Sequence, residues 1–111
     1  MEGESLTRIG AEQLAKAREA GSGRAAVTVF GGHEHDLRQT LIALVEGRAL
    51  GEHDAPDEAT LQVLTGQVRL HAGEESWDGA EGDYLVIPST RHDLEAMTDA
   101  VVLLTVASRA G

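Results

Sequence analysis

The sequence predicts an all-β domain, a sandwich or barrel of short strands, preceded by one short N-terminal α-helix. From residue 24 onward, short runs of apolar and β-branched residues alternate with turn residues, and thirteen of the 111 residues are glycine. Short strands at regular spacing are typical of all-β sandwiches and barrels. A chain of this length forms one domain with a single modest core. We therefore expect a helix and linker over residues 1–23 and a barrel over residues 24–111.

The helix is predicted over residues 5–20, which are rich in alanine. Ser5 or Thr7 can cap its N-terminus, and the segment Gly21-Ser22-Gly23 ends it. Its apolar residues fall on one face: Leu6, Ile9, Leu14 and Ala17. A helix this short is marginal alone, so we expect this face to pack against the barrel.

The strands are predicted from apolar runs between turn signals. They cover residues 27–30, 38–45, 61–64, 68–70, a segment around Trp77, 84–87 and 101–106. Thr65-Gly66 predicts a tight hairpin, and Asp78-Gly79 predicts a further turn. Because the chain has few aromatic residues, Trp77 and Tyr84 are expected to fill the core.

The composition excludes several classes of function. Nineteen acidic and nine basic residues give a formal charge of -10, and such a surface repels nucleic acids and anionic membranes. The chain has no cysteine, which excludes disulfides, thiolate metal sites and cysteine nucleophiles. Its apolar runs are of strand length, and its N-terminus carries no signal-peptide pattern. We expect a cytoplasmic location, by elimination, and neither a nucleic acid nor a membrane as partner.

One segment has a specific spacing of residues, Gly47-x5-His53-x-Ala55-x3-Ala59-x6-Gly66. It resembles the first motif of the cupin family, Gly-x5-His-x-His-x3-Glu-x6-Gly, with every spacing kept. Ala55 and Ala59 stand at two of the three positions that hold metal ligands in that family. The resemblance therefore implies a small single-domain cupin with a degenerate metal site.

A second segment resembles the second cupin motif. Gly82 and Pro88 keep its spacing, Thr90 stands where the family has glycine, and His92 comes one residue early. The two resemblances cover residues 38–106 and imply a double-stranded β-helix, the cupin jelly-roll barrel. Strand alternation then places an apolar set on the inward face of the barrel, Ala59, Leu61 and Val63, and a second set on the outward face, Thr60, Gln62 and Leu64.

The resemblance keeps His53 and His92 at two ligand positions, where each is either a metal ligand or a hydrogen-bonded structural histidine. A firmly held divalent ion needs three or four ligands. His35 is the third candidate: the segment His33-Glu34-His35 places both imidazoles on one face if it is extended, and a solvated loop is the alternative. Glu58 joins the set only if a bulge shifts its strand. The predicted cofactor is one divalent transition metal (Zn, Fe, Mn or Ni) or none.

The candidate ligand-binding residues are Arg38, His53, Glu58, Gln62 and His92. Arg38 could pair with Glu58 or Asp57, or offer its positive charge to an anionic ligand, and an ordinary solvated arginine is the alternative. The apolar inward face favours a ligand of hydrocarbon or aromatic character over a free sugar. No residue is assigned a catalytic role.

Three functions follow from the resemblance. The first is a non-catalytic barrel that binds a small organic molecule, since two ligand positions of the family are alanine. The second is a metal-dependent enzyme, such as a dioxygenase or isomerase, that uses His35, His53 and His92. The third is a regulatory barrel acting through a protein partner, since no helix-turn-helix is present. Small cupins commonly dimerise, so we expect a homodimer, with residues 25–30 suited to strand exchange.

Overall fold

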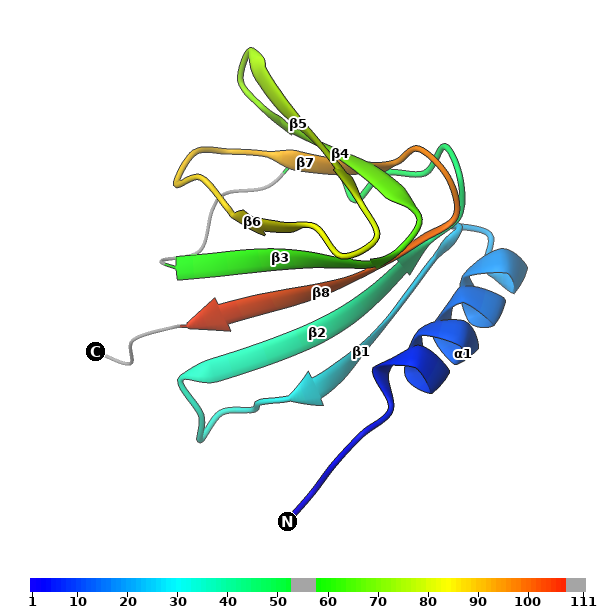
Figure 1. The fold of residues 1–111 in the computed structure, drawn as a ribbon, viewed down its shortest axis with the longest axis vertical. Helices are drawn as coiled ribbons and strands as arrows, with labels where there is room; N and C mark the ends of the chain where they lie inside the picture. The colour runs from blue at the N-terminus through cyan, green and yellow to red at the C-terminus, as the bar shows by residue number, and fades with distance from the viewer. Residues whose placement is uncertain (53–57, 108–111) are drawn as a thin grey trace.

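Our computed structural model describes residues 1–52 and 58–107 of the chain. One helix precedes a series of antiparallel strands (Figure 1). The elements are α1 (Leu6–Glu19), β1 (Arg24–Phe30), β2 (Leu37–Leu44), β3 (Glu58–Thr65), β4 (Gln67–Ala72), β5 (Glu75–Ala80), β6 (Tyr84–Val86), β7 (Asp93–Ala96) and β8 (Ala100–Ala107). Within the described part of the chain, no helix has the length and apolar character to span a membrane.

The strands form two sheets that face each other (Figure 1). The five-stranded sheet has the order β1-β2-β8-β3-β6, and the three-stranded sheet has the order β5-β4-β7. The C-terminal strand β8 lies between β2 and β3 and pairs antiparallel with both. Strands distant in the sequence therefore become neighbours, as a jelly roll requires. Residues 25–30 pair with β2 of the same chain, and their exchange between two chains stays a prediction.

The main core lies between the two sheets. Ala59, Leu61 and Val63 are buried, which confirms the predicted inward face of β3. On β2 and β8 the inward positions are even-numbered, so the partners across the sheet are Ile42 with Val102 and Thr40 with Leu104. The other buried members of this core are Leu44, Val68, Leu70, Leu94, Ala96 and Ala100.

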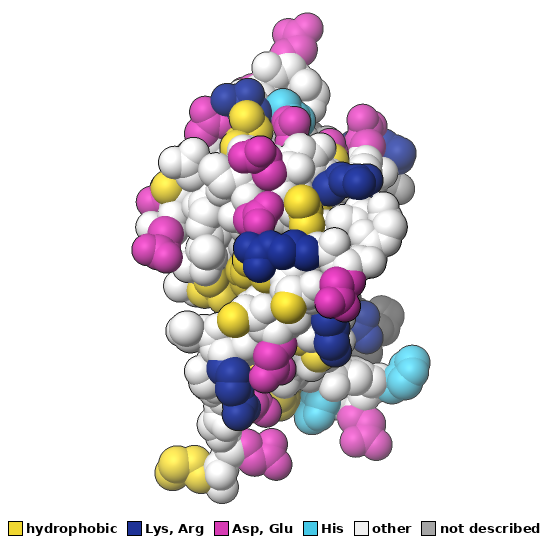
Figure 2. Space-filling view, turned by 90° about the vertical axis from the view of Figure 1, so that its right-hand side faces the viewer, with side chains coloured by type: hydrophobic (Ala, Val, Ile, Leu, Met, Phe, Trp, Pro, Cys, Tyr) yellow, Lys and Arg dark blue, Asp and Glu magenta, His cyan; other side chains and the backbone are white. Residues whose placement is uncertain are grey.

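A second cluster lies between the outer side of the five-stranded sheet and α1. Ser5 caps the helix by accepting a hydrogen bond from the Arg8 backbone N–H at 3.2 Å, as the sequence predicted. The predicted apolar face packs on this sheet, and Ala17 is fully buried against it. Gln13 is also buried, at 6% exposed, which the pattern did not indicate. Figure 2 shows this side of the molecule, where acidic and basic side chains lie interspersed around small apolar areas.

Three local predictions were wrong. Asp78-Gly79 lies inside β5 and not in a turn, because the two residues pair with Arg69 and Val68 of β4. The ring of Trp77 covers Gly79, so a Cβ there would clash with it. Tyr84 is 60% exposed on the edge strand β6, where the neighbouring Leu85 packs inward instead. Strand β7 was missed because its sequence, Asp-Leu-Glu-Ala, has low strand propensity, and pairing with β4 holds it in place.

Candidate ligand-binding site between the sheets

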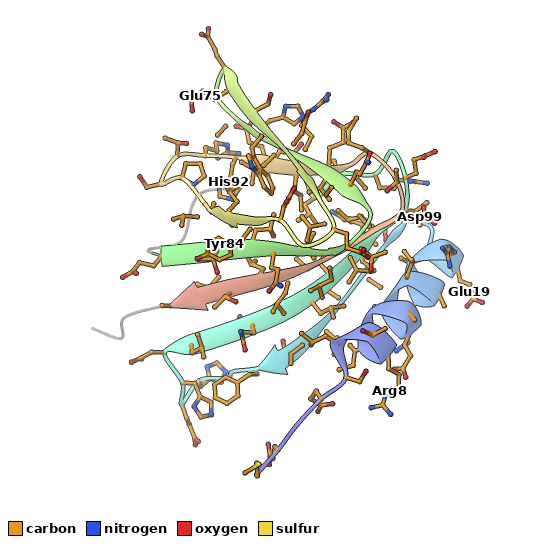
Figure 3. The ribbon with its side chains drawn as sticks, viewed as in Figure 1. Arg8, Glu19, Glu75, Tyr84, His92 and Asp99 are labelled. Atoms are coloured by element: carbon orange, nitrogen blue, oxygen red, sulfur yellow. The ribbon has the colours of Figure 1, made fainter. Side chains whose placement is uncertain are left out.

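His92 is buried between the two sheets at 3% exposed, directly before β7 (Figure 3). Its Nδ1 lies 2.9 Å from the backbone carbonyl oxygen of Thr90. A carbonyl can only accept, so Nδ1 carries the proton and donates. In the neutral imidazole the lone pair is then on Nε2. The short loop before His92 thus fixes both the position and the tautomer of the ring.

The remainder of the inner pocket around His92 is apolar. Its cavity measures about 20 Å³, room for about one water molecule. Two residues of its lining are also part of larger hollows, Leu70 on one side and Leu104 on the other. The complete lining is Ile42, Leu50, Leu61, Leu70, Ile87, His92, Leu94 and Leu104.

The hollow on the Leu70 side has a volume of about 190 Å³. Trp77 and Leu85 line it together with Pro88 of the second motif. The hydroxyl of Ser76 and the carboxylate of Glu75 are its polar groups. An aromatic ring beside aliphatic side chains suits an apolar ligand.

The hollow on the Leu104 side has a volume of about 420 Å³ and lies along the connection from β1 to β2. Leu104 and Val106 line its apolar side. Its polar lining comes from Gly32, His33, His35, Asp36, Arg38 and Thr40. We call this hollow the Arg38 groove. The ring of His35 packs on Phe30 with centroids 4.7 Å apart.

The structure brings together only some of the predicted site residues. His92 and Arg38 line adjacent hollows that share Leu104. Glu58 and Gln62 lie exposed on the outward face of β3, away from the interior. The bulge considered for Glu58 is absent, since the β3–β8 register is regular from Glu58 to Val63. His53 and Asp57 lie outside the described residues.

A metal centre finds limited support in the described residues. Within residues 1–52 and 58–107, no group of three or more His, Asp or Glu side chains comes together to hold an ion. His33 and His35 are exposed, and His71 is paired with Glu95 at 3.2 Å on the outer face of the three-stranded sheet. Among the described residues, His92 therefore belongs to no group that would hold a metal ion.

Sequence reasoning missed several residues of the site. Ile87 lies within the second motif, so the motif itself was a usable signal. Leu50 follows the first glycine of the first motif and contacts the inner pocket, but no pattern marked it. Thr40 faces inward opposite Leu104 and lines the Arg38 groove, and it was not among the candidate site residues.

Comparison with solved structures identifies this architecture. An RmlC-like cupin from Desulfovibrio desulfuricans aligns with 23% identity over 96% of this chain and 96% of its own, with a TM-score of 0.72. The fold is that of the cupins. The expected jelly-roll barrel with one N-terminal helix is confirmed.

Two further solved structures are similar to this chain. A conserved protein of unknown function from Streptococcus pyogenes has 26% identity over 83% of this chain and 80% of its own, with a TM-score of 0.72. A salicylate 1,2-dioxygenase from Pseudoaminobacter salicylatoxidans has 22% identity and a TM-score of 0.75; the match covers 96% of this chain and 34% of the dioxygenase. No family model and no curated protein matches the sequence.

Proposed function

We propose that this cupin barrel binds one small organic molecule with an apolar body between its two sheets. His92 is the polar contact within the interior. The supporting observation is the buried imidazole of His92 in a lining that is otherwise aliphatic. Binding pockets commonly combine an apolar lining with a few fixed polar groups.

Burial and orientation of His92 support this role. Removing an imidazole from water costs free energy unless its polar atoms form hydrogen bonds, and burying a leucine at that position would cost less. The Thr90 carbonyl orients the ring by accepting from Nδ1. The hollow beside Trp77 and the groove beside Leu104 provide space on both sides of the inner pocket. The degenerate first motif, with Ala59 on the inward face, supports binding rather than metal chemistry.

A fragment screen by methyl-detected NMR tests this function. Ligands that enter the barrel shift the methyl signals of Leu61, Leu70 and Leu104 together, since these side chains line one continuous interior. His92→Leu should weaken binding about tenfold by removing the polar contact. His71→Gln is the matched control, because His71 lies on the outer face. A screen without binders, or binders that leave these methyl groups unshifted, contradicts the proposal.

The alternative is a metal-dependent enzyme that uses His92 with His53 and His35. The Nδ1–H bond to a carbonyl supports it, since metal-ligating histidines typically make such a bond from the other ring nitrogen. A bound Zn, Fe, Mn or Ni ion would supply Lewis-acid or dioxygen chemistry. The exposed position of His35 in the Arg38 groove speaks against this set.

Elemental analysis of tag-free protein loaded with each metal in turn distinguishes the two functions. Near-stoichiometric metal that is lost in both His53→Ala and His92→Ala supports the enzyme. Full metal occupancy in both variants contradicts this ligand set. Protein that retains no metal after loading supports the binding function. The melting temperature of each variant reports whether it folds.

A further inference from the structure

Arg38 lies on the face of β2 that points between the sheets. It pairs across the sheet with Val106, and the next inward positions along β2 are Thr40 and Ile42. Ile42 is buried in the core, so the same alternation directs Arg38 toward the interior side of the sheet. Strand geometry thus brings a guanidinium to the edge of the apolar interior.

Arg38 makes no ion pair or hydrogen bond with a described residue, although the chain is rich in carboxylates. Five other arginines are engaged: Arg8 with Glu12, Arg18 with Asp99, Arg24 with the Leu50 carbonyl, Arg69 with Asp78 and Arg91 with Glu52. Arg48 is exposed and, like Arg38, has no ion pair with a described residue, but it lines none of the hollows described above. Asp36 lines the same groove as Arg38, but the two side chains form no ion pair within 4 Å. The guanidinium keeps its five N–H donors available to a ligand.

The surroundings of Arg38 provide further donors and an apolar wall. Thr40 adds a hydroxyl, and His33 and His35 add imidazole nitrogens. Leu104 and Val106 form the apolar side. Since Leu104 lines both the groove and the inner pocket, a molecule held at Arg38 can lay its apolar part along Leu104, beside the inner pocket.

We infer that the ligand of this barrel is an organic carboxylate, held by its anionic group at Arg38 with its apolar body along Leu104. This inference rests on the proposed function and specifies its ligand class. A net charge of -10 repels anions in general, so an anionic ligand binds only where a local positive charge outweighs that field. Arginine matches a carboxylate with two parallel hydrogen bonds, which makes the contact directional.

Matched pairs of acids and amides test the inference. The probes are benzoate and hexanoate, compared with benzamide and hexanamide, which have the same apolar bodies without the charge. We expect each acid to bind about tenfold more tightly than its amide, as measured by titration of the Leu104 methyl signals. The preference should decrease as the salt concentration rises.

Variants assign the preference to one side chain. Arg38→Gln should reduce the acid-to-amide ratio to about one, because the loss of the charged contact weakens acid binding more than amide binding. Arg8→Gln makes the same change in net charge on the surface of α1, so it should keep the full preference. Acids and amides that bind equally to the unchanged protein overturn the inference and leave the proposed function standing. Failure of all four probes to bind the interior contradicts both.

Discussion

The two ends of the barrel differ in how their polar side chains are engaged. At the end where β3 turns into β4 and β7 turns into β8 (Figure 1), polar groups are hydrogen-bonded to one another. Asp99 lies at this end (Figure 3). The Asp99 carboxylate accepts from the Glu46 backbone N–H at 2.8 Å and from Arg18 at 2.9 Å. The Thr98 hydroxyl accepts from the Gln67 backbone N–H at 3.0 Å. We call this the closed end.

At the opposite end, which we call the mouth, polar groups face hollows. Arg38 lines a groove and has no ion pair with a described residue, and His92 faces an aliphatic pocket. The difference indicates that the closed end stabilises the fold, whereas under the proposed function the mouth is the end that binds the ligand. Substitutions at the two ends should therefore separate stability from binding.

The largest loss of stability is expected from Gly66→Ala at the closed end. Gly66 has a φ of 79°, and a Cβ there would lie 2.1 Å from the Asp99 carbonyl oxygen. The clash is with backbone, so the turn must shift, at a cost of about 3 kcal/mol or more. Gly82→Ala is the matched control: its φ is 90° but no atom lies within 4 Å of the added Cβ. It should cost about 1–2 kcal/mol in urea unfolding. Equal losses of stability in the two variants would show that the clash at Gly66 adds nothing to the cost.

Asp99→Asn should cost about 1–2 kcal/mol, because it weakens a hydrogen bond to backbone and an ion pair at once. The Glu46 backbone N–H, then Arg18, lowers the pKa of Asp99. A lowered folded-state pKa means that this stability is present above the ordinary aspartate value of 3.8 and is lost as the pH falls through the folded-state value. Melting temperatures of the two proteins should therefore converge at low pH. A difference in melting temperature that stays constant from pH 7 to pH 3 would contradict the role of the ionised Asp99 carboxylate.

His92→Leu should change stability by about 1 kcal/mol or less, since a leucine suits the aliphatic pocket and exposed Thr90 can bond to water instead. The affinity for the ligand should fall, while the melting temperature should stay nearly unchanged. A loss of several kcal/mol would mean that His92 is a structural residue. Urea unfolding and ligand titration of the same preparation measure both quantities.

The smallest effect on stability is expected from Arg38→Gln, within about 0.5 kcal/mol, since the side chain is exposed and has no ion pair with a described residue. Its effect should appear in the affinity for carboxylates alone. A melting temperature lowered by more than a few degrees would show that Arg38 supports the fold of the β1–β2 connection.

The sequence by itself determined the barrel, its helix and the inward face of β3. Those features depend on local signals: alternation along the strand of Ala59 to Val63, a Ser5 cap, and the spacing of two motifs. Gly66 marked its hairpin for the same reason, because a residue with positive φ is needed at that turn.

Only the tertiary structure decided the contents of the site. Arg38 and His92 are 54 residues apart in numbering, and they come near each other because β8 pairs with β2 and carries Leu104 between their two hollows. Whether Gly79 forms a turn or lies in a strand likewise depends on pairing with Val68 of β4, eleven residues earlier in the chain. Burial and pairing across long sequence distances carry no local signature, so these features follow from packing rather than from any pattern in the chain.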